Sequence, residues 1–207
     1  MKSNAYNWLK KHLQGIIQFL FRIKIYGNEN EPREEDGPYI VIANHISNID
    51  PVLICCALDH QQPHYMAKKE LFKVPVLSSL IKALGAYPVD RGGADVGAIR
   101  RTIRMLEEGK CIGIFPQGHR RKGIDPKETE VKSGVGMMAV RSGVKVLPCF
   151  IRTKKRKFTP FCKIEVIVGK PVESSELNYD PDANGEYARI SELLFKKVCE
   201  LEECYRG

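Results

Sequence analysis

Short apolar runs alternate with longer amphipathic segments through most of this chain, and this alternation constrains the fold more than any other feature. The runs that predict strands span residues 39–43, 63–67, 86–89, 111–115, 145–150 and 163–168. The segments with helical spacing span 48–58, 75–84, 94–108, 133–142 and 185–204. Strands that alternate with helices predict an α/β fold, a single domain whose largely parallel or mixed sheet carries helices on its faces. The 207 residues are enough for one sizeable core.

The N-terminal segment predicts an amphipathic helix over residues 5–22. Its apolar positions at helical spacing are Tyr6, Leu9, Leu13, Ile16, Ile17 and Leu20, and Trp8, Phe19 and Phe21 widen the apolar side. Aromatic residues beside Lys10 and Lys11 favour a helix that lies in a membrane interface, while the alternative is a helix packed on the domain. No stretch reaches the roughly 18 apolar residues of a membrane span. We therefore divide the chain into an interfacial helix, 1–24, and a main domain, 25–207.

Charge and cysteine content limit the possible partners. The net charge of +8 suits a nucleic acid, an anionic membrane surface or a phosphorylated substrate. No nucleic-acid motif accompanies the basic residues, so a nucleic-acid partner is not expected. The seven cysteines are odd in number and scattered, with no C-x-x-C pair and no zinc-like His/Cys spacing. These features predict a reduced, intracellular chain without a metal site.

The segment Asn44–Pro51 places a histidine and a carboxylate on one turn. His45 follows the strand 39–43, and Ser47 and Asp50 have the spacing of a capping box, with Pro51 in the first helical turn. A histidine oriented by a carboxylate can deprotonate a hydroxyl at neutral pH. The alternative is that Asp50 only caps the helix and His45 is only a polar strand-end residue. One carboxylate can also do both.

Cationic residues follow three other predicted strands. Lys68 follows the strand 63–67, Arg91 follows the strand 86–89, and the loop 116–121 after the strand 111–115 contains Gly118 and Arg120. Ligand sites in α/β sheets lie at the carboxyl ends of the strands, so these residues and His45 are expected at one rim. Glycine permits close approach of backbone, and arginine offers a planar fork to phosphate oxygens.

Together these segments match an ordered series of motifs. They are N-H-x-S-x-x-D at 44–50, A-K-x-E-L-x-x-x-P at 67–75, G-x-x-x-x-x-R at 85–91, F-P-Q-G-H-R at 115–120 and a Leu-Pro strand at 147–148. In this order and spacing the chain resembles the lysophosphatidic acid acyltransferases (1-acyl-glycerol-3-phosphate O-acyltransferases) over about residues 38–150. It departs from the family pattern F-P-E-G-T-R at two positions, where Gln117 replaces the glutamate and His119 the threonine.

The resemblance implies a role for each motif residue. His45 would be the base that takes a proton from the acceptor hydroxyl, and Asp50 would orient it. Lys68, Arg91, Gly118 and Arg120 would hold the acceptor phosphate. Gln117 would also bind the substrate and would keep the hydrogen bonds of the glutamate without its charge. No metal, cofactor or covalent acyl-enzyme is implied.

The implied reaction moves an acyl group from acyl carrier protein or coenzyme A to the sn-2 hydroxyl of 1-acyl-glycerol 3-phosphate, giving phosphatidic acid for phospholipid biosynthesis. We expect a peripheral, monotopic enzyme on an anionic membrane surface, at the cytoplasmic face of the cell membrane. The basic run 153–157 would contact lipid head groups or an acidic acyl carrier, or would be only a solvated hairpin turn. The alternatives are another acceptor, such as glycerol 3-phosphate or another lysolipid, and a non-catalytic lipid-binding protein. The presence of both His45 and Asp50 argues against the latter.

Overall fold

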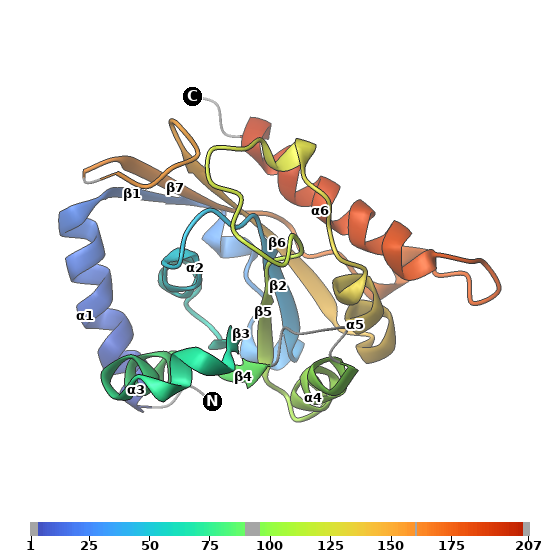
Figure 1. Cartoon of the computed structure of the whole chain (residues 1–207). Helices are drawn as coiled ribbons and strands as arrows, with labels where there is room; N and C mark the ends of the chain where they lie inside the picture. Colours follow the sequence, from blue (N-terminus) through green and yellow to red (C-terminus); the bar gives the residue numbers. More distant parts are fainter. Residues whose placement is uncertain (1–3, 90–95, 160, 205–207) are drawn as a thin grey trace.

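A computed structural model of the chain describes residues 4–89, 96–159 and 161–204 and contains one twisted sheet with helices on both faces (Figure 1). The strands are β1 (Arg22–Tyr26), β2 (Tyr39–Ala43), β3 (Pro63–Lys68), β4 (Tyr87–Val89), β5 (Cys111–Ile114), β6 (Lys145–Thr153) and β7 (Lys163–Val168). The α-helices are α1 (Asn4–Leu20), α2 (Asp50–Ala57), α3 (Pro75–Ala83), α4 (Val96–Glu107), α5 (Gly134–Ser142) and α6 (Glu186–Cys204). Short 3-10 turns include η3 (Lys69–Lys73) and η4 (Pro126–Glu128).

The sheet has the order β1-β7-β6-β2-β5-β3-β4 and is mostly parallel. Only β6 and β7 pair in the antiparallel direction, so β1 and β7 run opposite to the other five strands. The predicted α/β fold is confirmed, and the six predicted strands are all present. Strand β1 was not predicted, because its sequence R-I-K-I-Y is short and half-exposed and directly follows the long helical pattern of α1.

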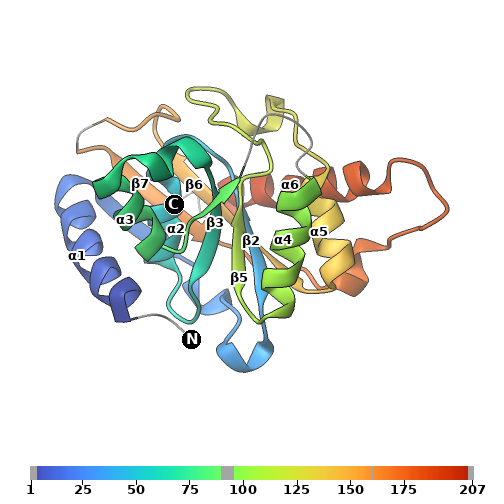
Figure 2. The same ribbon diagram turned by 60° about the horizontal axis from the view of Figure 1, so that its bottom comes forward.

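The strong strand β2 separates two apolar layers. Tyr39 and Val41 face α1 and α2, whereas Ile40 and Ile42 face α4, α5 and α6. Successive side chains of a strand point to opposite faces, so a strand buried on both faces is a continuous apolar run, as here. Figure 2 shows α1 and α3 on one side of the sheet and α4 and α5 on the other.

Helix α1 packs on the domain along one side and is exposed along the other. Tyr6 and Ile17 are buried in the layer beside α2, and the Lys10 Nζ donates hydrogen bonds to Leu58 O at 2.6 Å and Asp59 Oδ1 at 2.8 Å. Trp8 on the opposite side is 63% exposed. Helix α1 therefore packs on the domain, as in the second alternative above, and its opposite side remains apolar and exposed. Among the described residues, every helix is too short or too polar to cross a bilayer.

The basic run 153–157 forms the turn between the antiparallel strands β6 and β7. Arg156 is committed to ion pairs with Asp125 Oδ2 at 2.7 Å and Glu202 Oε1 at 3.0 Å. Lys154 and Lys155 are exposed at the turn. The predicted hairpin turn is thus present, and its proposed contact with lipid head groups or an acyl carrier stays a prediction.

Candidate active site

The centre of the site is the pair formed by His45 and Asp50. The His45 Nδ1 lies 2.7 Å from Asp50 Oδ2, and the imidazole is 13% exposed while the carboxylate is fully buried. An ionised Asp50 holds the imidazole proton on Nδ1, which leaves the lone pair of Nε2 as the basic position. No described residue forms a hydrogen bond with that nitrogen. The imidazole can therefore accept a proton from a substrate hydroxyl that binds next to Nε2.

Asp50 also organises the turn that carries His45. Its Oδ2 accepts hydrogen bonds from the backbone N–H groups of Ile46 at 2.6 Å and Ser47 at 2.7 Å. Burial raises the pKa of the Asp50 carboxyl above its ordinary value, and the bonds from His45, Ser47 and Ile46 oppose that rise. One carboxylate oxygen thus serves both the turn and the imidazole.

Of the two hydrogen bonds of the predicted capping box, the one to the Ser47 side chain is absent. Helix α2 begins at Asp50, two residues later than predicted, and its N-cap, Ile49, makes no side-chain capping bond. The Ser47 hydroxyl accepts only a long bond, 3.5 Å, from Ile49 N. The Asp50 half is present as the bond from Ser47 N, and Pro51 lies in the first turn as predicted. The physical reason is that Asp50 is drawn to the imidazole, so the turn before α2 remains irregular.

The loop after β5 holds His45 from the other side. The His45 backbone N–H donates to the Gln117 Oε1 at 2.7 Å, and the His45 carbonyl oxygen accepts from the Arg121 N–H at 2.7 Å. The Phe115 ring stacks on the imidazole with centroids 4.2 Å apart and planes 17° apart. This is possible because β2 and β5 are adjacent parallel strands, so the loops after them meet at one edge. His45 is consequently fixed at its backbone, its Nδ1 and one ring face.

Gln117 is buried, with 1% exposure, and both ends of its amide are used. Its Nε2 donates to the Thr129 Oγ1 at 2.7 Å, and that hydroxyl donates to Pro126 O at 2.7 Å. The amide therefore joins the His45 turn to the segment 126–129. A glutamate at 117 would lack the donor that Thr129 accepts here.

Asn44 fastens the end of β2 to β6. Its Nδ2 donates to Ile151 O at 3.0 Å and its Oδ1 accepts from Ile151 N at 2.7 Å. The Asn44 amide thus bonds to both backbone groups of Ile151, as a neighbouring strand would, at the residue before His45.

The predicted phosphate-binding residues that the structure describes are exposed, unlike His45 and Asp50. Lys68 is exposed at the end of β3, and Gly118 and Arg120 lie in the exposed loop after β5. These strands are parallel and belong to the same sheet as β2, so their carboxyl ends lie at the edge that carries His45. Gly118 has a left-handed φ of +72°, which disfavours other residues. Arg91 lies outside the described residues.

Several residues of the site were not predicted. Phe115 stacks on His45, Thr129 completes the Gln117 network, and Tyr65 continues the stack at 5.8 Å from Phe115. Lys132 places its side chain over Gly118, where an added Cβ would lie 3.4 Å from the Lys132 Cγ. Only Phe115 carried a signal, because it opens the motif F-P-Q-G; Thr129 and Lys132 stand in ordinary polar sequence.

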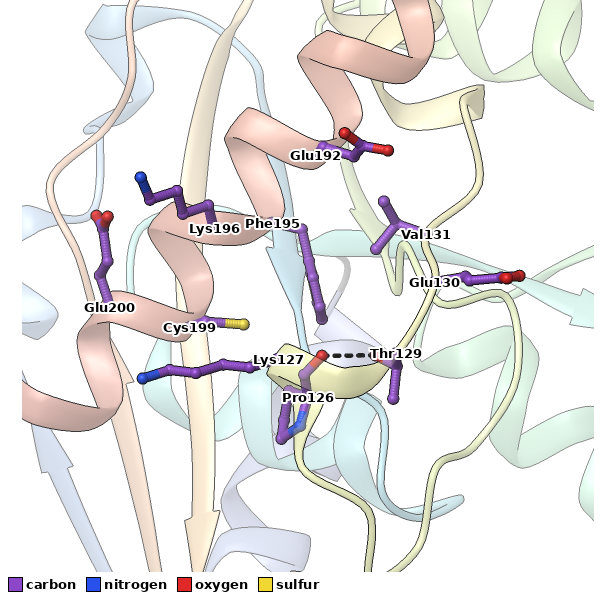
Figure 3. A pocket seen from close by; sticks show the side chains of 10 residues that line it. All are labelled: Pro126, Lys127, Thr129, Glu130, Val131, Glu192, Phe195, Lys196, Cys199 and Glu200. Carbon is purple, nitrogen blue, oxygen red and sulfur yellow. Dashed lines mark hydrogen bonds between the residues drawn. The ribbon is translucent and has the colours of Figure 1, made fainter.

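Two cavities lie near these residues. A small one of about 60 Å³ is lined by His45, Tyr65, Met66, Phe115 and Gly118. A larger one of about 740 Å³ lies between the segment 126–131 and α6 and does not include His45 (Figure 3). Figure 3 shows Phe195 and Val131 pointing into it, with charged side chains around the rim. Thr129 lines the larger cavity and bonds to Gln117, which in turn bonds to His45 in the smaller one.

Similarity to known proteins agrees with this geometry. Residues 22–152 match the family model described as "Acyltransferase", which covers the His45 turn and the loop after β5. The chain is 27% identical over 199 residues to a 1-acyl-sn-glycerol-3-phosphate acyltransferase of Bacillus subtilis, covering 95% of this chain and 96% of that protein. It is 32% identical over 124 residues to the protein of that name from Streptococcus pneumoniae, of which the match covers 45%.

A solved structure has the same fold. The crystal structure of the 1-acyl-sn-glycerophosphate (LPA) acyltransferase PlsC from Thermotoga maritima superimposes with a TM-score of 0.70 at 27% sequence identity. The match covers 98% of this chain and 81% of that one. With the family model covering more than half of the sequence, this chain belongs to the Acyltransferase family.

Proposed function

We infer that this chain is a 1-acyl-sn-glycerol-3-phosphate acyltransferase, which forms phosphatidic acid from an acyl thioester and a lysophosphatidic acid acceptor. The observation that carries this is the His45–Asp50 pair, whose Nδ1 and Oδ2 lie 2.7 Å apart beside a glycine- and arginine-containing loop. The relatives named for this activity, one of them matched over nearly its whole length, support the choice of acceptor.

The proposed step is direct acyl transfer. The His45 Nε2 takes the proton of the sn-2 hydroxyl as its oxygen attacks the thioester carbon. The C–O bond forms, the C–S bond breaks, and the imidazolium returns the proton to the departing thiolate. An ionised Asp50, buried against Nδ1, would stabilise the imidazolium that forms in between.

The other side chains divide into two groups. Lys68, Arg91, Gly118 and Arg120 would bind the acceptor phosphate, and Lys132 is a further cation for it because its side chain lies over Gly118. Gln117 would act through His45, since both ends of its amide are bonded within the protein. We therefore propose it as a positioning residue, in place of the substrate contact expected from the resemblance. The peripheral membrane location remains part of the proposal and is supported by the exposed side of α1.

The decisive experiment replaces His45. The variant His45→Ala should lose at least about 10²–10⁴-fold in turnover of acyl-coenzyme A with 1-acyl-glycerol 3-phosphate, measured as released thiol. His60→Ala, an exposed histidine remote from the site, is the matched control and should keep parental turnover. Product mass spectrometry identifies phosphatidic acid. Parental turnover in His45→Ala, or a different acylated product, would reject the proposal.

A further inference from the structure

We propose that Arg156 is a positioning residue for the acyl transfer inferred above, because it fastens the loop 115–125 that holds the backbone of His45. Its Nη1 lies 2.7 Å from Asp125 Oδ2, and its Nη2 lies 3.0 Å from Glu202 Oε1. We call these three side chains the Arg156 clamp. The reaction rests on the function proposed above, whereas the contacts of the clamp do not depend on it.

The backbone of Arg156 has a conformation that arginine disfavours. Its φ is +50°, in the left-handed region that glycine and asparagine enter at lower cost. The turn between β6 and β7 therefore gives no local reason for an arginine at this position. The side chain supplies one, because Asp125 and Glu202 are only 29% and 13% exposed, and partly buried ion pairs are screened less than exposed ones.

The Arg156 clamp joins three parts of the chain that are far apart in sequence. Asp125 ends the loop 115–125, Glu202 lies in the last turn of α6, and Arg156 lies in the β6–β7 turn. Figure 1 shows the loop passing between that turn and the C-terminal end of α6. The Arg156 carbonyl oxygen also accepts a hydrogen bond from the Gly123 N–H at 2.9 Å. Arg156 thus holds the loop at two residues.

The loop 115–125 in turn bonds to both backbone polar groups of His45. The Arg121 N–H donates to His45 O at 2.7 Å, and the His45 N–H donates to Gln117 Oε1 at 2.7 Å. A single residue separates Arg121 from Gly123. A displacement of Gly123 therefore moves the donor that holds the His45 carbonyl.

Asp125 connects the clamp to the Gln117 network as well. Its Oδ2 faces Arg156, while its Oδ1 caps η4 by accepting a backbone N–H at 3.0 Å. The Pro126 carbonyl oxygen at the start of η4 accepts the Thr129 hydroxyl, which accepts the Gln117 amide. Loss of the ion pair would therefore loosen both bonds to the His45 backbone.

The clamp also packs beside the His45 turn. Arg156 and Ile124 line, with Asn44 and Ile46, a narrow cavity of about 10 Å³. Asn44 and Ile46 are the two neighbours of His45 in the sequence. Because this space holds no more than about one water, a shift of Arg156 is passed on to residues on both sides of His45.

The test replaces Arg156 by asparagine in the full-length protein. Asparagine accepts the left-handed φ and keeps the carbonyl oxygen that binds Gly123. Arg156→Asn should lower kcat for 1-acyl-glycerol 3-phosphate about 10–10²-fold, because a small displacement of a catalytic base has effects of this size. The acceptor KM should stay within about twofold, since Arg156 bonds only to groups of the protein. Arg156→Lys should recover part of the lost kcat, because an ammonium can pair with one of the two carboxylates.

Arg189→Asn is the matched control for lost stability. Arg189 Nη2 donates to Glu186 Oε2 at 2.8 Å and to the carbonyl oxygens of Leu177 and Asn178 at 3.0 and 2.8 Å. It is therefore also an arginine that fastens a loop to α6, but at the first turn of the helix. Its replacement should lower the free energy of unfolding and leave kcat at the parental value.

Asp125→Asn tests the same ion pair from the side of the loop. Asparagine can still cap η4, so this variant also serves if Arg156→Asn does not fold. It should lower kcat, and the double variant Asp125→Asn/Arg156→Asn should have about the kcat of Arg156→Asn alone, because the two side chains act through one contact.

Amide hydrogen exchange separates the clamp from the proposed function. Peptides covering 44–49 and 116–125 should exchange faster in Arg156→Asn than in the parent or in Arg189→Asn. Such exchange in a protein without transferase activity would retain the clamp and reject only the proposed function. Unchanged exchange over 44–49, parental kcat in Arg156→Asn, or an equal loss of kcat in Arg189→Asn would each overturn the positioning role. A raised acceptor KM at parental kcat would also overturn it.

Discussion

Asp50 combines two demands, because the oxygen that holds the imidazole also holds the turn before α2. Replacement by Asn keeps an oxygen for the N–H groups of Ile46 and Ser47 but removes the charge that stabilises a protonated His45. We expect Asp50→Asn to lower kcat by about 10²–10⁴-fold, slightly less than His45→Ala. Thiol release measures this, with Asp59→Asn as a surface control. An Asp50→Asn enzyme with parental kcat would mean that His45 needs no carboxylate.

The buried carboxyl of Asp50 also makes the stability of the protein depend on pH. Burial raises the pKa of Asp50, so the folded chain binds its proton more readily than the unfolded chain does. The free energy of unfolding of the parent therefore falls as pH rises from the ordinary carboxyl pKa through the raised one. The Asp50→Asn variant has no carboxyl to titrate and does not lose this free energy. The difference in unfolding free energy between the two proteins should therefore change over the same pH range in denaturant titrations. A constant difference would contradict the raised pKa.

Gln117 is the second residue whose role can be isolated. Gln117→Glu should keep kcat within about tenfold, because Thr129 can turn its hydroxyl from Pro126 O to the new carboxylate. Gln117→Leu leaves the His45 N–H unpaired, at about 1–3 kcal/mol, and should lower kcat more than the acceptor KM.

Thr129 provides the matched test of that network. Thr129→Val should lower kcat relative to the parent. Thr129→Ser should keep the parental kcat, because only the hydroxyl is required. Equal kinetics of Gln117→Leu and the parent would remove Gln117 from the site.

At the scale of elements, α1 has a structural role in the domain, whatever it contacts on its exposed side. Tyr6 is fully buried beside α2, whereas Trp8, two residues on, is exposed. Tyr6→Ala should therefore cost about 3–5 kcal/mol of unfolding free energy, the usual range for a large aromatic truncation. Trp8→Ala should cost less than about 0.5 kcal/mol. Denaturant unfolding measures both, and similar values for the two would mean that Tyr6 does not anchor α1 on the domain.

At the scale of the whole molecule, the fold was largely predictable and the site only partly so. Strands such as β2 are continuous apolar runs bounded by turn residues, and these local patterns determine the element and its face. His45 and Asp50 could be paired because they lie five residues apart. The bonds from Gln117 and Arg121 to the His45 backbone could not be derived, because they depend on β5 lying beside β2. Strand β1 was missed because it is short and half-exposed and directly follows the helical pattern of α1.

The bonds that fix the start of the His45 turn have a consequence for synthesis on the ribosome. His45 N is held by a side chain 72 residues later, and Asn44 by a backbone 107 residues later. A nascent chain that already displays α1 and the complete His45–Asp50 turn still lacks β5 and β6. Such a chain cannot yet catalyse, because domains assemble their distant pairings only after those segments emerge. Formation of the His45–Asp50 turn and catalytic competence are therefore separated in time by the translation of roughly half the protein.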